Sequence, residues 1–118
     1  DLVTVNNSDE QYWLIGAIRS WWEISNQAYW IGLNDTADET CDTWPADASD
    51  WRSGWTWSSG EAYTYQAWSN RYGYFGQPDN SGDEDCVEMN LWNWQPWNAD
   101  WNDSRCWNDK YFICEASP

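Results

Sequence analysis

Histidine is absent from the 118 residues of the chain. Its absence removes the commonest general base, the imidazole of nucleophile–His–acid triads and the commonest zinc ligand. An enzyme that uses two carboxylates, as glycosidases do, is weakly supported. The sequence therefore argues against an enzyme.

Basic residues and long apolar runs are also scarce. The chain has 5 Lys and Arg against 20 Asp and Glu, giving a formal charge of −15. Nucleic-acid binding requires clustered Lys and Arg, so the charge argues against a nucleic-acid partner. No run approaches the roughly eighteen apolar residues of a membrane span. No charged and then apolar leader opens the chain, so we expect a mature or processed form.

Four cysteines are present, and no two of them form a C-x-x-C pair. Zinc and redox chemistry are therefore disfavoured. Several cysteines in a short acidic chain are typical of structural disulfides in an oxidising compartment, which predicts a secreted, extracellular protein.

Aromatic residues are abundant, with 14 Trp, 7 Tyr and 2 Phe. Each ring can bury roughly 150–250 Å², so a folded core is feasible despite the charge. We expect most rings to pack inside and a minority to face a ligand. The length fits one domain over residues 1–118.

The hydrophobic pattern predicts an α+β fold. Residues 4–22 contain a helix that Ser8 can cap, with Trp13, Leu14, Ala17, Ile18 and Trp21 at helical spacing. Strands are expected at 29–33, 55–57, 86–91 and 110–114, and the alternation over 86–91 indicates a half-buried strand. Residues 35–50 and 69–85 are predicted loops.

Oxygen-bearing side chains concentrate in two places. One runs from Gln77 to Asn80 and then to Glu84-Asp85, directly before Cys86; the other is Asn102-Asp103, three residues before Cys106. Ca²⁺ takes about six to eight oxygen ligands, which such clusters can supply. The alternative is that these acidic loops are only solvated surface.

Six motifs occur in order along the chain, and together they resemble the C-type lectin-like domain from about residue 1 to 116. They are Tyr29-Trp30-Ile31-Gly32-Leu33-Asn34-Asp35, Trp55-x-Trp57-x-x-Gly60, Gln77-Pro78-Asp79-Asn80, Glu84-Asp85-Cys86, Trp101-Asn102-Asp103-x-x-Cys106 and Phe112-Ile113-Cys114-Glu115. The resemblance implies small antiparallel sheets, helices and a long calcium-binding loop region. The start of the chain matches the segment after the family's usual N-terminal strand and first helix, so we expect both to be missing from this N-terminally short carbohydrate-recognition domain.

The resemblance also implies the ligands of the family's principal calcium site: Gln77, Asp79, Glu84, Asn102 and Asp103. Pro78 would follow a cis peptide bond. A second Trp-Asn-Asp copy at 107–109 lacks the cysteine three residues on, so we expect it at the surface.

An auxiliary calcium site in many relatives corresponds here to Asp35, Glu39, Asn80 and Asp85. Residues 40–54 look like an insertion that could displace Glu39.

The resemblance implies that hydroxyl groups of the sugar bind directly to the calcium ion that the five principal ligands hold. The Gln-Pro-Asp triplet resembles the galactose type, so the expected partners are glycans with terminal galactose or N-acetylgalactosamine rather than mannose. Galactose-binding relatives often place a Trp after the triplet, which this chain lacks. The candidate rings for stacking are Tyr72, Tyr74, Phe75, Trp94 and Trp97.

Two other functions remain open at this point. An acidic matrix or mineral-associated protein without sugar binding would use the charge itself as its surface. Ice binding, which this family also performs, is more distant.

We predict a disulfide between Cys86 and Cys106, which flank the two ligand-bearing loops. Cys114 lacks its family partner and Cys41 has no family counterpart, so the two form either a mutual bridge or bonds to another chain, in a disulfide-linked complex or a homo-oligomer. Glycosylation sequons begin at Asn6, Asn34 and Asn102. A glycan on Asn102 would block calcium ligation, so that sequon is expected to be unused.

Overall fold

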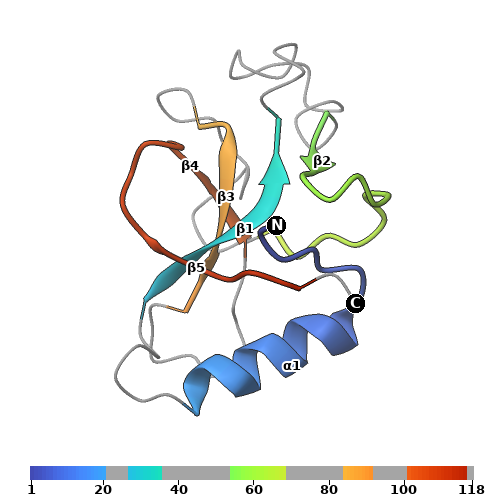
Figure 1. Ribbon diagram of the computed structural model, residues 1–118, viewed down its shortest axis with the longest axis vertical. Helices are drawn as coiled ribbons and strands as arrows, with labels where there is room; N and C mark the ends of the chain where they lie inside the picture. Colours follow the sequence, from blue (N-terminus) through green and yellow to red (C-terminus); the bar gives the residue numbers. More distant parts are fainter. Residues whose placement is uncertain (21–26, 36–53, 69–83, 92–100, 117–118) are drawn as a thin grey trace.

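The computed structural model describes residues 1–20, 27–35, 54–68, 84–91 and 101–116, and these contain one helix and five strands (Figure 1). The α+β class predicted from the sequence is confirmed. The elements are α1 (Ser8–Arg19), β1 (Ala28–Asn34), β2 (Thr56–Trp57), β3 (Cys86–Asn90), β4 (Trp101–Ser104) and β5 (Tyr111–Phe112).

The N-terminus of α1 is capped by Asn7, whose side-chain oxygen accepts a 2.9 Å hydrogen bond from the backbone N–H of Glu10. The prediction of Ser8 as the cap is wrong by one residue, because Ser8 already lies in the first turn. The carboxylate of Glu10 in turn accepts a 2.7 Å bond from the backbone N–H of Asn6. The first bond satisfies an N–H that the helix itself leaves without a partner, and the second ties the residue before the cap to the first turn.

The buried face of α1 is formed by Gln11, Leu14, Ile15 and Ile18. Trp13, which the helical spacing placed on the apolar face, is 70% exposed. The expected stripe is therefore rotated toward Gln11 and Ile15.

The sheet has the order β2-β1-β3-β4, and β5 pairs with β1 in parallel. β3 runs antiparallel to both of its neighbours, with Ile31 opposite Val87 on one side and Val87 opposite Asp103 on the other. The hydrophobic pattern did not predict β4. A four-residue strand carrying Asn and Asp gives no period-two signal, and it forms because β3 supplies its hydrogen-bonding partner.

Trp101 is the centre of the core and is fully buried. The rings of Trp57, Tyr65 and Trp68 meet it edge-on, with centroids 5.6–5.8 Å away. Its indole Nε1 donates a 3.2 Å hydrogen bond to Oε1 of Gln11. Because an indole N–H needs a partner when buried, this bond explains why Gln11 lies on the inner face of α1.

The predicted disulfide between Cys86 and Cys106 is confirmed, with Cα atoms 5.1 Å apart. Cys114 is an exposed free thiol, so the structure does not contain the bridge between Cys41 and Cys114 that the sequence left open. Cys41 itself lies outside the described residues.

Candidate functional site

The predicted ligands divide into described residues and residues outside the described ranges. Glu84, Asn102 and Asp103 of the principal set are described, as are Asp35 and Asp85 of the auxiliary set. Outside the described residues lie Gln77, Pro78, Asp79, Glu39 and Asn80, together with the candidate stacking rings Tyr72, Tyr74, Phe75, Trp94 and Trp97.

Two auxiliary-site acids lie side by side. Asp35 follows the last residue of β1 and Asp85 precedes the first residue of β3, and the backbone N–H of Asp35 donates to the carbonyl of Asp85 at 3.1 Å. Asp35 is 2% exposed. Among the described residues, nothing donates a hydrogen bond to the buried Oδ1 of Asp85. A carboxylate oxygen withdrawn from water is unfavourable unless a donor or a positive charge reaches it, so Oδ1 of Asp85 is a candidate ligand.

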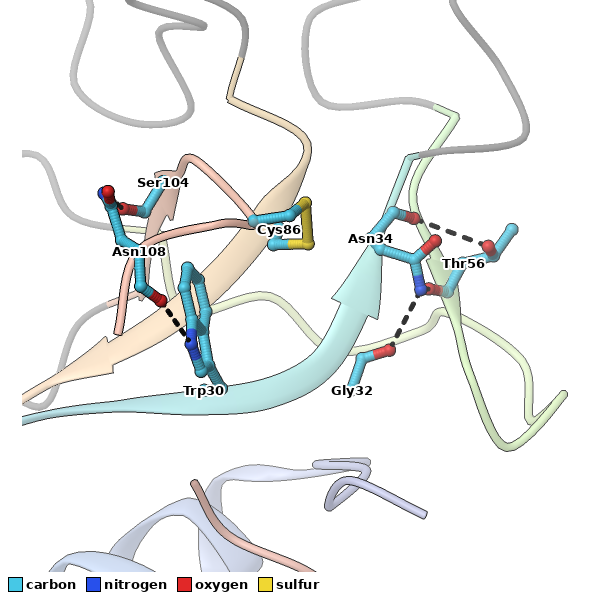
Figure 2. Close-up of a disulfide and its surroundings, with 8 residues drawn as sticks. Trp30, Gly32, Asn34, Thr56, Cys86, Ser104 and Asn108 are labelled. Carbon is cyan, nitrogen blue, oxygen red and sulfur yellow. Dashed lines mark hydrogen bonds between the residues drawn. A yellow bond between two sulfur atoms is a disulfide. The ribbon is translucent and has the colours of Figure 1, made fainter. Parts of the chain in front are cut away.

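The register of β3 and β4 gives the positions of the described principal-site residues. Cys86 in β3 pairs with Ser104 in β4. Glu84, just before β3, and Asp103, in β4, therefore lie at the same end of this strand pair. The Cys86–Cys106 disulfide ties these chain segments together (Figure 2). Asp103 is 0% exposed. The structure therefore places Glu84 and Asp103 at the same end of the strand pair, whereas Asn102 pairs with Glu88 further along β3.

The ligand sets extend beyond these residues. Within the described ranges, no group of three or more His, Cys, Asp or Glu side chains is arranged to hold a metal ion. Each predicted site also draws on side chains outside those ranges: Gln77 and Asp79 in the principal site, Glu39 and Asn80 in the auxiliary one. The oxygen-only chemistry of both sets fits Ca²⁺.

Asn102 takes part in a network that the sequence did not reveal. Its Nδ2 donates to Oε1 of Glu88 at 2.8 Å, and Oε2 of Glu88 lies 3.2 Å from Nζ of Lys110. The alternation of β3 placed Glu88 on a solvent-facing side, but it is only 6% exposed. Long-range partners cover it, and no local pattern marks them.

The second Trp-Asn-Asp copy lies at the surface, as predicted. Trp107 is 68% exposed, and Asn108 and Asp109 are exposed as well. The backbone oxygen of Asn108 accepts a 3.2 Å hydrogen bond from Nε1 of Trp30 (Figure 2). This copy thus contributes a backbone contact to the fold.

The sequon at Asn102 has little room for a glycan. Its amide nitrogen is already bonded to Glu88, and Ser104 at the third position is 5% exposed. Both observations support the prediction that this sequon is unused.

Two groups with displaced pKa values lie away from the predicted ligands. Hydrogen bonds from Asn6 and Ser59 hold the pKa of the Glu61 carboxyl below its usual value, and burial together with Tyr111 raises the pKa of Tyr29. Both side chains line a cavity of about 710 Å³ between α1 and β5, whose lining includes the Cys114 thiol and none of the predicted calcium or sugar ligands.

In the part of the chain that the structure describes, no helix is both long enough and apolar enough to cross a membrane.

Comparisons with known proteins agree with the motifs. The family model described as Lectin C-type domain matches residues 1–116. C-type lectin domain family 4 member M of Nomascus concolor is 36% identical over 114 residues, which is 97% of this chain and 22% of that protein. The chain therefore spans less than a quarter of that relative's length. The perlucin-like protein of Mytilus galloprovincialis is 30% identical over 115 residues, covering 96% of this chain and 59% of that protein.

Among solved structures, the human scavenger receptor C-type lectin carbohydrate-recognition domain superposes with a TM-score of 0.67. It is 28% identical, and the match covers 99% of this chain and 72% of that one.

Proposed function

Because the chain belongs to the C-type lectin domain family, we propose that it is a secreted, calcium-dependent carbohydrate-binding module for terminal galactose or N-acetylgalactosamine. Family proteins of this kind bind carbohydrates without catalysis. In this proposal the acidic residues of the chain therefore serve as calcium ligands.

A buried carboxylate oxygen in the Glu84-Asp85-Cys86 motif is the observation that carries the proposal. Oδ1 of Asp85 is buried and accepts no hydrogen bond from the described residues, and the carbonyl of Asp85 accepts a 3.1 Å hydrogen bond from the backbone N–H of Asp35. Withdrawing carboxylates from water is unfavourable unless they are paired, hydrogen-bonded or bound to a metal. A cation at this end of the sheet would meet that requirement.

In the proposed assignment, Gln77, Asp79, Glu84, Asn102 and Asp103 hold the principal ion, and Asp35, Glu39, Asn80 and Asp85 hold the auxiliary one. A bound Ca²⁺ supplies direct coordination of two neighbouring sugar hydroxyls. The carboxylates accept the protons of those hydroxyls and the amides donate to their lone pairs. A shallow site of this kind binds weakly, so useful affinity would come from several copies in a homo-oligomer, a disulfide-linked second chain or a longer protein.

Calcium should raise the melting temperature, and EDTA at neutral pH should reverse the effect, because a ligand that binds only the folded state stabilises it. Acid should weaken the effect, because the carboxylate ligands must remain ionised. Asp103→Ala should abolish most of the calcium-induced shift, whereas Asp109→Ala should leave it nearly intact. A melting temperature indifferent to calcium would contradict the proposal.

Galactose should elute the protein from a galactose resin in calcium better than mannose or N-acetylglucosamine does. The Gln-Pro-Asp triplet sets donors and acceptors for one stereochemistry of the hydroxyl pair, and a mismatch leaves polar groups unpaired at a cost of about 1–3 kcal/mol. Preferential elution by mannose would refute the sugar preference and leave the calcium site untouched.

The formal charge of −15 favours a second candidate, an acidic matrix or mineral-associated protein. Such a protein would bind cationic surfaces with strong salt dependence and without inhibition by sugars. Sugar inhibition in millimolar calcium distinguishes the two.

A further inference from the structure

A buried carboxylate lies directly beside one of the proposed calcium ligands. On neighbouring positions of β3 and β4, Nδ2 of Asn102 donates to Oε1 of Glu88 at 2.8 Å. The other carboxylate oxygen of Glu88 lies 3.2 Å from Nζ of Lys110. Since each oxygen has its own partner, the carboxylate of Glu88 is held at both ends.

Lys110 is itself fixed from a second side. Its Nζ lies 5.2 Å from the centre of the Trp30 ring, a cation–π contact. Nε1 of Trp30 donates to the carbonyl of Asn108, which holds the ring in place (Figure 2). The contacts therefore run from Asn102 through Glu88 and Lys110 to Trp30, and such a satisfied buried network is rigid.

This network determines which end of the Asn102 amide faces Glu88. The two ends of an asparagine amide have nearly the same shape, but only the oxygen can ligate a cation. A carboxylate paired with an ammonium group only accepts hydrogen bonds, so the NH₂ end must face Glu88. Among the described residues, nothing donates to Oδ1 of Asn102.

We propose that Glu88 is a positioning residue for calcium binding. It presets the amide of Asn102 so that Oδ1 is free for the ion and the second N–H of Nδ2 remains free for a sugar hydroxyl. The inference rests on the proposed function, because it assigns Asn102 to the calcium site.

The test is Glu88→Gln. Lys110 requires a hydrogen-bond acceptor, and a glutamine side chain has only one, its carbonyl oxygen. In the variant that oxygen would face Lys110 and the glutamine NH₂ group would face Asn102. Oδ1 of Asn102 would then turn toward the glutamine and away from the ion. We expect calcium affinity, measured by calorimetric titration, to fall at least about tenfold, as changes next to metal ligands typically do. Glu61→Gln is the matched control: Glu61 also accepts from an asparagine side chain, Nδ2 of Asn6 at 3.1 Å, but lies outside the site. It should leave calcium affinity unchanged.

A second background separates positioning from charge. Asn102→Asp provides two equivalent oxygens, so the ligand no longer needs orienting. If Glu88 acts through the amide, Glu88→Gln should cause no loss of affinity in that background. An equal loss of calcium affinity in both backgrounds, or no loss in the native background, would overturn the inference. Calcium binding by the native protein would still support the proposed function. Absence of calcium binding by the native protein would refute both.

If Glu88→Gln does not fold in EDTA, the native protein supplies the measurement. In calcium-free protein, the Asn102 side-chain amide should show one proton shifted downfield and slow to exchange with solvent. Exchange as fast as in an exposed asparagine would overturn the inference.

Discussion

At the scale of single residues, Gly32 shows how closely the N-terminal segment approaches β1. Its backbone N–H donates to the carbonyl of Val3 at 2.9 Å. A Cβ at this position would lie 2.8 Å from Oγ of Ser58, 2.9 Å from the carbonyl oxygen of Leu2 and 3.2 Å from that of Val3. The serine hydroxyl can rotate away, but the two backbone oxygens are held by pairing with the C-terminal segment.

Gly32→Ala should therefore lower the free energy of unfolding by about 1–3 kcal/mol, the usual cost of overpacking. Gly16→Ala is the control, because Gly16 lies in α1 and no atom beyond the adjacent helix backbone lies within 4 Å of the added Cβ. It should stabilise the protein by about 0.5–1 kcal/mol. Urea unfolding of both variants measures the difference, and a neutral Gly32→Ala would show that the segment has room to move.

At the scale of elements, the first turn of α1 depends on side chains that precede it. Asn7 accepts from the backbone N–H of Glu10, and the Glu10 carboxylate accepts from that of Asn6. The carboxylates of Asp9 and Glu10 also lie at the positive end of the helix dipole. Gln11 and the core residues of α1 follow within one turn, so fraying here would disturb the contact with Trp101.

Asn7→Ala should cost about 1 kcal/mol of stability, the typical value for a lost N-cap. Ser8→Ala should cost less, because Ser8 is exposed and does not cap the helix. Thermal unfolding monitored by circular dichroism compares the pair. A larger loss of stability for Ser8→Ala than for Asn7→Ala would indicate that Ser8 is the N-cap.

At the scale of the whole molecule, the Cys86–Cys106 disulfide and the Trp101 cluster act on the same strands. The disulfide joins residues 20 apart in sequence, at the end of β3 and β4 where Glu84 and Asp103 lie. Trp101 connects the other end of β4 to α1 and to the rings of Trp57 and Trp68. The position of β4 is therefore fixed from both ends.

Replacing Cys86 and Cys106 together by alanine should lower the free energy of unfolding by about 2–4 kcal/mol, since the bridge restricts the unfolded chain. Cys114→Ala, which removes an exposed free thiol, should change it by no more than about 0.5 kcal/mol. Denaturant unfolding in EDTA separates this effect from calcium. Equal stabilities of the double variant and the native protein would contradict the expectation.

The sequence by itself determined the α+β class, the helix, most strands, the family and the central disulfide. Helical spacing, apolar runs and turn residues are local signals, and they survive whatever the chain packs against. The six ordered motifs carry the family because each spans only a few residues. The surface position of the second Trp-Asn-Asp copy also followed from local spacing to a cysteine.

Only the tertiary structure decided which polar side chains are buried and what they touch. Glu88 occupies a position that alternation assigned to solvent, yet Asn102 and Lys110 cover it from other segments. Trp13 fits the helical stripe but is exposed, while Gln11 turns inward to bond Trp101. Burial depends on partners distant in sequence, and the free energy of withdrawing a polar group from water is determined by those partners rather than by its neighbours along the chain.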